Sequence, residues 1–90
     1  MIEPEIVVFG GRTFVGEFYA RYSSDNSISL KNLLEIQKEG SDLELIIPEF
    51  VLASMNDFYS FSKCNILRLT PTKKLTSVYN ETIQTMKMGM

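Results

Sequence analysis

The chain has 90 residues, of which 44% are apolar, and a net charge of −2 at pH 7. This length predicts one domain, with a core near the lower limit for independent stability. The composition excludes a disordered or low-complexity chain, and the acidic balance argues against a generic basic nucleic-acid binder.

The first predicted element is a strand over residues 5–9, which is rich in β-branched and aromatic side chains. Gly10-Gly11 follows at once and predicts a tight hairpin, because both glycines can adopt positive φ. The next run, residues 12–22, alternates between apolar and polar side chains and predicts one long strand. Gly16 within this run indicates a sharp bend or the close approach of another backbone.

A turn at residues 23–26 separates this strand from a third one at 28–36. Leu33 is apolar but out of phase in the third strand, and a bulge or bend near Asn32 accounts for this shift. The composition of residues 38–42 indicates another turn.

A fourth strand is predicted at residues 43–47, and it ends at Pro48 because proline cannot donate to a ladder. The segment 49–57 is compatible with an extension of this strand and with a short turn of helix. Two further short strands are predicted at 58–62 and 65–70, joined by a tight connection.

Thr70-Pro71 then predicts the start of a helix, because threonine at the cap and proline in the first helical position are favoured there. Apolar side chains recur after it at spacings of three and four, which places them in one stripe along a helix. The stripe consists of Leu75, Val78, Tyr79, Ile83 and Met86. We expect it to pack on the strands.

Five or six short strands are too few for a sandwich, and curling into a small barrel minimises their exposed edges. We therefore expect a single mainly β domain over residues 1–90. It would be a small, strongly bent, five-stranded antiparallel barrel at about 5–70, followed by a C-terminal α-helix at about 71–88.

The chemistry of most enzyme sites is missing from the sequence. The chain has no histidine and one cysteine, Cys64, so zinc sites and Cys–His or Ser–His nucleophiles cannot form. Gly10-Gly11 lies between two strands rather than before a helix, which does not fit a phosphate loop. We expect a binding protein and not an enzyme, with no catalytic residue, no metal and no cofactor.

The sequence predicts a cytoplasmic protein without a membrane partner. Its apolar runs are far shorter than the roughly 20 residues of a membrane span. The acidic start does not resemble a signal peptide, and the single cysteine agrees with a reducing compartment.

Charge is unevenly distributed along the chain. Residues 1–62 carry a net charge of −6, whereas residues 63–90 carry +4. This asymmetry can present a basic surface at one end of the domain. A solvated helix with surplus lysines explains it equally well.

Part of the chain resembles the Sm-like family. In residues 7–18, two apolar positions precede a glycine turn and an apolar-x-Gly-x-apolar pattern follows, as at the opening of the first Sm motif. Residues 28–32 resemble the third Sm strand, and 65–69 stand where the short last strand of the second motif is expected. The chain departs from the family at the Asp-x-apolar-Asn signature, because Asp25-Asn26 is out of that register.

The resemblance implies an SH3-like (Sm-like) barrel that pairs its fourth and fifth strands with neighbouring copies. We expect a cyclic homo-oligomer, a closed ring of about five to seven copies. Sm, LSm and Hfq proteins bind single-stranded RNA around the pore of such a ring. The loops of this chain that match their RNA-binding loops supply Tyr22, Ser23, Asp25, Asn26, Ser62, Lys63 and Asn65.

These residues offer a ring for base stacking, amides and hydroxyls for base edges, and a cation for phosphate. Each also has a structural explanation: Tyr22 continues the apolar face of its strand, Asp25 and Asn26 are common turn formers, and Lys63 fits a solvated turn. The alternative function is therefore a small SH3-like scaffold that binds protein partners and no RNA, which the acidic balance favours.

Overall fold

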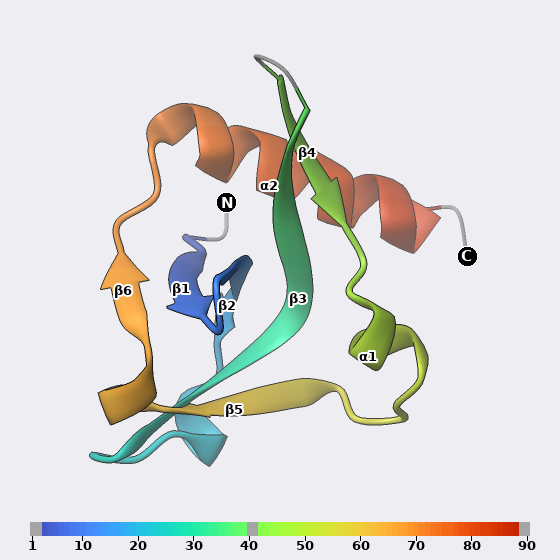
Figure 1. The fold of residues 1–90 in the computed structure, drawn as a ribbon. Helices are drawn as coiled ribbons and strands as arrows, with labels where there is room; N and C mark the ends of the chain where they lie inside the picture. Colours follow the sequence, from blue (N-terminus) through green and yellow to red (C-terminus); the bar gives the residue numbers. More distant parts are fainter. Residues whose placement is uncertain (1–2, 40–41, 89–90) are drawn as a thin grey trace.

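The computed structural model describes residues 3–39 and 42–88, and its main element is an antiparallel sheet of six strands (Figure 1). The strands are β1 (Glu5–Phe9), β2 (Arg12–Phe18), β3 (Ser27–Glu39), β4 (Asp42–Ile46), β5 (Phe58–Ser62) and β6 (Leu67–Leu69). The helical elements are the 3₁₀ turns η1 (Ala20–Tyr22) and η2 (Lys63–Asn65) and the helices α1 (Glu49–Leu52) and α2 (Lys73–Met88).

The strand order is β4-β3-β2-β1-β6, and β5 also pairs with β3. Strand β3 is long enough to hold β5 through residues 27–31 and β4 through residues 35–39. In the described part of the chain, β5 pairs only with β3 and β6 only with β1, so the sheet is open between β5 and β6. The predicted mainly β antiparallel domain with a C-terminal helix is confirmed, with six strands in place of five.

The first two strands form the predicted hairpin. Gly10 and Gly11 have φ values of 58° and 76°, and Phe9 pairs with Arg12 across the two-residue turn. Strand β2 ends earlier than the predicted residue 22, because the backbone amide of Tyr19 already donates to a carbonyl of β3 and the chain then enters η1.

Gly16 and Asn32 bend the sheet, as predicted. The pairing register shifts around Gly16, where an added Cβ would lie 3.1 Å from the Cβ of Leu30 and 3.1 Å from the carbonyl oxygen of Lys31. Asn32 has a φ of 51°, in the left-handed region that asparagine tolerates better than most residues. The bend lets one strand belong to both halves of the sheet.

Apolar side chains are buried on both faces of the central strands, which places the hydrophobic core in two clusters. One cluster, under α2, consists of Ile6, Val15, Leu34, Leu75, Tyr79 and Ile83. The other, on the opposite face, consists of Val7, Phe14, Ile28, Leu30, Leu33 and Phe61. Because alternate residues face opposite clusters, residues 6–9 of β1 are all apolar, and Leu33 is apolar although its neighbour Leu34 belongs to the other cluster.

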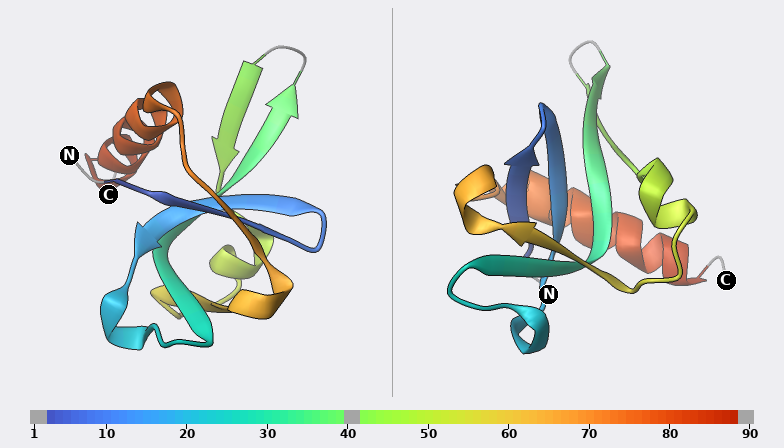
Figure 2. Two further views of the ribbon diagram at one scale, coloured as in Figure 1. Left: turned by 90° about the vertical axis from the view of Figure 1, so that its left-hand side faces the viewer. Right: turned by 60° about the horizontal axis from the view of Figure 1, so that its bottom comes forward.

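The structure settles two other predictions and leaves a third in part outside the described residues. The ambiguous segment after Pro48 contains the short helix α1. Helix α2 begins at Lys73, after the predicted start at Thr70-Pro71, and the hydroxyl of Thr72 accepts a 3.1 Å hydrogen bond from the amide of Leu75. The predicted turn between β3 and β4 includes residues 40–41, which lie outside the described residues. The β3–β4 hairpin projects from the body of the molecule (Figure 2).

Candidate functional site

The two loops in which the sequence predicts RNA-binding residues are adjacent in the structure. The amide of Lys63, at the start of η2, donates a 2.9 Å hydrogen bond to the carbonyl oxygen of Asn26. One residue away, Ser27 and Ser62 are paired across β3 and β5. Residues separated by 37 positions in the chain therefore form one surface.

A group of three aromatic rings, from Tyr19, η1 and β5, lies at the other end of β5, where Phe58 pairs with Lys31. The ring of Tyr22 is stacked on that of Phe58, with centroids 4.2 Å apart and planes at 7°. Tyr19 meets both rings edge to face, at 5.0 Å from Tyr22 and 5.6 Å from Phe58. We call these three residues the aromatic platform. Tyr22 is 43% exposed, so the platform reaches the surface.

Two cations flank the aromatic platform. The Nζ atom of Lys31 lies 5.1 Å from the ring centroid of Tyr19, and the Cζ atom of Arg21 lies 5.6 Å from that of Tyr22. Such distances suit cation–π attraction. The surface therefore combines exposed π systems with positive charge, the two features that single-stranded nucleic acids require of a binding surface.

Buried Ser29 holds η1 in place. Its hydroxyl donates to the carbonyl oxygen of Tyr22 at 2.6 Å and lies 2.6 Å from the hydroxyl of Ser60 on β5. Its amide donates to the hydroxyl of Ser23, and its carbonyl accepts from the amide of Tyr19. The turn that carries the aromatic platform is thus anchored to β3 rather than free to move as a loop.

The predicted site residues have different environments. Ser23 has a structural role, because its hydroxyl also donates to the carbonyl oxygen of Tyr19 at 2.9 Å. Ser62 is exposed at the end of β5, and its hydroxyl lies 3.0 Å from the sulfur of Cys64. The predicted site residues Asp25, Asn26, Lys63 and Asn65 are exposed as well.

Sequence reasoning missed Tyr19 and Phe58 as partners of Tyr22, and also the flanking cations. The spacing of the two tyrosines was a usable signal: residues three apart eclipse one another in a 3₁₀ turn. The predicted continuous strand would have placed Tyr19 and Tyr22 on opposite faces. No local pattern linked either tyrosine to Phe58, because that contact depends on how β5 pairs with β3.

A second feature, an aromatic hollow of about 330 Å³, lies at the hairpin end of β1 and β2. It is lined by Phe9, Gly10, Arg12, Phe14, Phe50 and Phe61. The guanidinium of Arg12 lies over two of these rings and donates two hydrogen bonds, of 2.9 and 2.6 Å, to the carboxylate of Glu35. These hydrogen bonds hold the pKa of Glu35 below its ordinary value.

Comparison with protein-family models and with curated proteins finds no match for this chain. Residues 3–39 and 42–88 contain no group of three or more His, Cys, Asp or Glu side chains placed to hold a metal ion. None of the helices within those ranges has the length and apolarity needed to cross a membrane.

Proposed function

We propose that the chain is a non-catalytic, Sm-like subunit that assembles into a closed ring and binds single-stranded RNA. The observation that carries this proposal is the hydrogen bond from Lys63 to Asn26, which brings the two candidate loops together at one end of β5, while the aromatic platform lies at the Phe58 end of the same strand. Bases stack on such rings whatever their sequence, and the adjacent cations can neutralise phosphates.

The open sheet edges support assembly. The proposal assigns β5 and β6 to the fourth and fifth strands of an Sm barrel, with β4 as an additional strand paired to β3. Leu67 and Leu69 on β6 are 59% and 44% exposed, and an exposed apolar edge strand is a template for pairing with another chain. Because each copy offers two different edges, pairing β5 of one copy with β6 of the next can close a ring.

Ring closure would also concentrate positive charge. The turn η2 joins β5 to β6, so it lies between the two edges that pair with neighbours. Each copy would therefore present its Lys63 at the same level of the ring. A ring of such sites can bind RNA although the net charge of one subunit is −2.

RNA titration followed by fluorescence anisotropy tests the binding. We expect uridine-rich or adenine-rich single strands to bind with an affinity that falls as salt is raised. Tyr22→Ala should weaken binding about fivefold or more, since stacking on an aromatic ring contributes about 1–3 kcal/mol per base. Lys63→Ala should reduce the salt dependence of RNA binding. Lys87→Ala, which changes a lysine in the last turn of α2, should leave the affinity and its salt dependence unchanged. Absence of binding at low salt would contradict an RNA-binding function.

A scaffold that binds protein partners is the second candidate, and the aromatic hollow favours it. Its four phenylalanine rings and single guanidinium resemble the apolar pockets with few polar groups that bind side chains. Under this function RNA would not bind, and Phe9→Ala would abolish partner capture while the Tyr22 substitution had no effect. The exposed thiol of Cys64 supports a reducing, cytoplasmic location for either function.

A further inference from the structure

The outer face of β5 connects the aromatic platform to the two candidate loops. Side chains alternate between the faces of a strand, and those of Tyr59 and Phe61 pack against the core cluster under this strand. The residues on the opposite, outer face are therefore Phe58, Ser60 and Ser62. The platform lies at the first of these residues, and the junction of the two loops follows the last.

Strand β3 contributes polar side chains to the same face, because residues directly opposite each other in an antiparallel pair share a face. The outward pairs are Ser27 with Ser62, Ser29 with Ser60, and Lys31 with Phe58. The face thus has a cation and an aromatic ring at one end and hydroxyl groups along the rest of its length. Hydroxyl groups suit the polar edges of bases and riboses better than the apolar surface of a protein partner.

The direction of two hydrogen bonds determines what Ser60 offers to a ligand. The hydroxyl of Ser29 has one hydrogen and donates it to the carbonyl oxygen of Tyr22. The hydroxyl of Ser60 lies 2.6 Å from that of Ser29, so Ser60 is the donor in this second bond. Exposed Ser60 therefore presents only lone pairs to a ligand. Phosphate oxygens also only accept, whereas the 2′-hydroxyl of a ribose can donate.

The cations beside this face are available to phosphates. Among the described residues, the ion pairs join Arg12 to Glu35 and Arg68 to Glu5. The cations in neither pair include Arg21, Lys31 and Lys63. Carboxylates near the same face balance them in number, those of Glu17, Asp25 and Asp57. Attraction to phosphate is therefore local, and stacking and hydrogen bonds along β5 contribute the remaining affinity.

We infer that one strand of RNA passes along the outer face of β5, from the aromatic platform to Lys63, and that Ser60 accepts a hydrogen bond from a ribose 2′-hydroxyl on this path. The inference rests on the proposed RNA binding and adds to it a path and a preference for RNA over DNA. Pairing of β5 with a neighbouring copy uses its backbone edge and leaves this face open. The 5 residues of β5 span about 13 Å at roughly 3.3 Å per step, which is about four stacked nucleotides.

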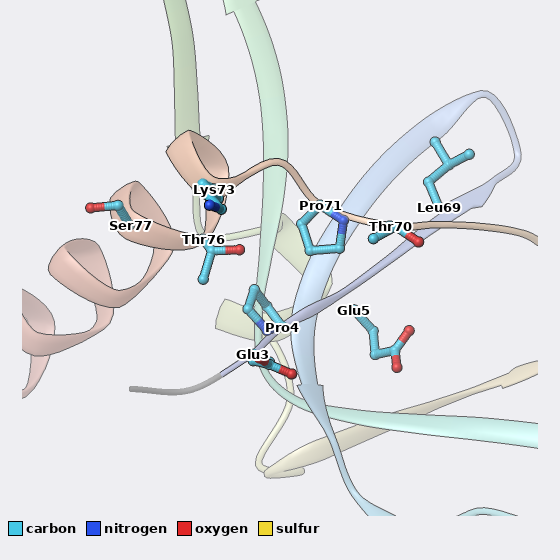
Figure 3. A pocket seen from close by; sticks show the side chains of 9 residues that line it. All are labelled: Glu3, Pro4, Glu5, Leu69, Thr70, Pro71, Lys73, Thr76 and Ser77. Carbon is cyan, nitrogen blue, oxygen red and sulfur yellow. The ribbon is translucent and has the colours of Figure 1, made fainter.

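The groove between β1, β6 and α2, with a volume of about 710 Å³, lies outside this path (Figure 3). The carboxylates of Glu3 and Glu5 line it together with Lys73, so its charge does not favour a polyanion. Ser77 in the same lining is exposed, as Ser60 is, and belongs to α2 rather than to the sheet. Ser77→Ala is therefore the matched control for Ser60→Ala.

Fluorescence anisotropy with the full chain tests the path, using oligouridine and oligodeoxyuridine of one length that exceeds the span of β5. We expect the wild type to bind the RNA more tightly than the DNA. Ser60→Ala should weaken RNA binding about threefold to tenfold, the contribution of a single hydrogen bond, and leave DNA binding and the salt dependence unchanged. In this variant Ser29 keeps its bond to Tyr22, so the platform is unaltered.

Two further variants complete the test. Ser60→Thr keeps the hydroxyl and should keep the preference for RNA, and Ser77→Ala should bind both strands as the wild type does. If RNA binds but Ser60→Ala binds it as tightly as the wild type, the path along β5 is wrong and RNA binding stands. If neither strand binds at low salt, RNA binding itself is wrong, and the path with it.

Discussion

The hydroxyl of Tyr79 on α2 donates a 2.7 Å hydrogen bond to the carbonyl oxygen of Asn32 at the bend of β3. Tyr79 is fully buried, and its burial raises the pKa of the phenol far above its ordinary value. The side-chain amide of Asn32 donates to the carboxylate of Glu17 on β2. Asn32 on β3 is therefore bonded to both α2 and β2, and the hydrogen bond from Tyr79 adds to the apolar packing of α2 against the sheet.

Tyr79→Phe should lower the free energy of unfolding by about 1–2 kcal/mol, because it removes the hydrogen bond from a buried tyrosine to the partly buried carbonyl of Asn32. Urea unfolding measures the change. Tyr59→Phe is the matched control: it also removes a tyrosine hydroxyl bonded to a carbonyl, but at an exposed position and 3.3 Å, so we expect a much smaller loss. Equal losses in the two variants would contradict a special role for Tyr79.

Asn32→Ala should destabilise the domain by about 1–2 kcal/mol, since alanine is strained at a φ of 51°. Asn32→Gly should be less harmful than Asn32→Ala, because glycine adopts this conformation without strain. Thermal unfolding of the two variants decides the question. If alanine were tolerated as well as glycine, left-handed backbone at the bend would not be a constraint on this residue.

Gly16→Ala should cost about 1–3 kcal/mol, the usual penalty for an extra methyl group in a filled core. The new Cβ would meet the Cβ of Leu30, the Cδ1 of Leu33 and the carbonyl oxygen of Lys31, all at 3.1 Å. Gly11→Ala should also destabilise, but through its positive φ, since nothing lies within 4 Å of its added Cβ. Leu33→Ala should therefore partly rescue Gly16→Ala and have no such effect on Gly11→Ala.

The bidentate pair of Arg12 and Glu35 should make stability depend on pH in the acid range. Because the hydrogen bonds from Arg12 lower the pKa of Glu35 in the folded state, the unfolded chain takes up a proton first. Their stabilisation is complete above the ordinary value of 4.5 and is lost as the pH falls through the folded pKa.

Melting temperatures recorded from neutral pH to about pH 3 test this dependence. Glu35→Gln should be less stable than the wild type at neutral pH, and the difference should shrink as the pH falls. A difference that stayed constant down to acid pH would contradict the assignment to the Glu35 carboxylate.

Much of the fold was predictable because it depends on local rules. The glycine pair fixed the first hairpin, and the interrupted phase near Asn32 located the bend of β3. Strand β2 was predicted too long because its alternating pattern continues after Phe18, whereas the backbone is diverted by hydrogen bonds to Ser29, a residue of another strand. Hydrogen bonds between residues far apart in the chain produce no repeating pattern of apolar and polar residues, so the sequence alone does not reveal them.

The candidate site was predictable only in part, for the same reason. The family resemblance pointed to both loops, and the structure joins them through Asn26 and Lys63. It could not distinguish Ser23, whose hydroxyl is engaged in two hydrogen bonds to the backbone, from an available ligand group. Phe58 was taken as an ordinary strand residue, because its role depends on its stacking against Tyr22.

The solution mass of the wild-type chain, measured by size exclusion with light scattering, tests the central claim most directly. Pairing of β5 with β6 of the next copy predicts one sharp species of about five to seven copies, since edge pairing of identical subunits closes into cyclic symmetry. Leu67→Lys, which places a charge on the β6 edge, should then shift the protein toward smaller species. A wild-type chain that remains monomeric at high concentration would contradict the ring.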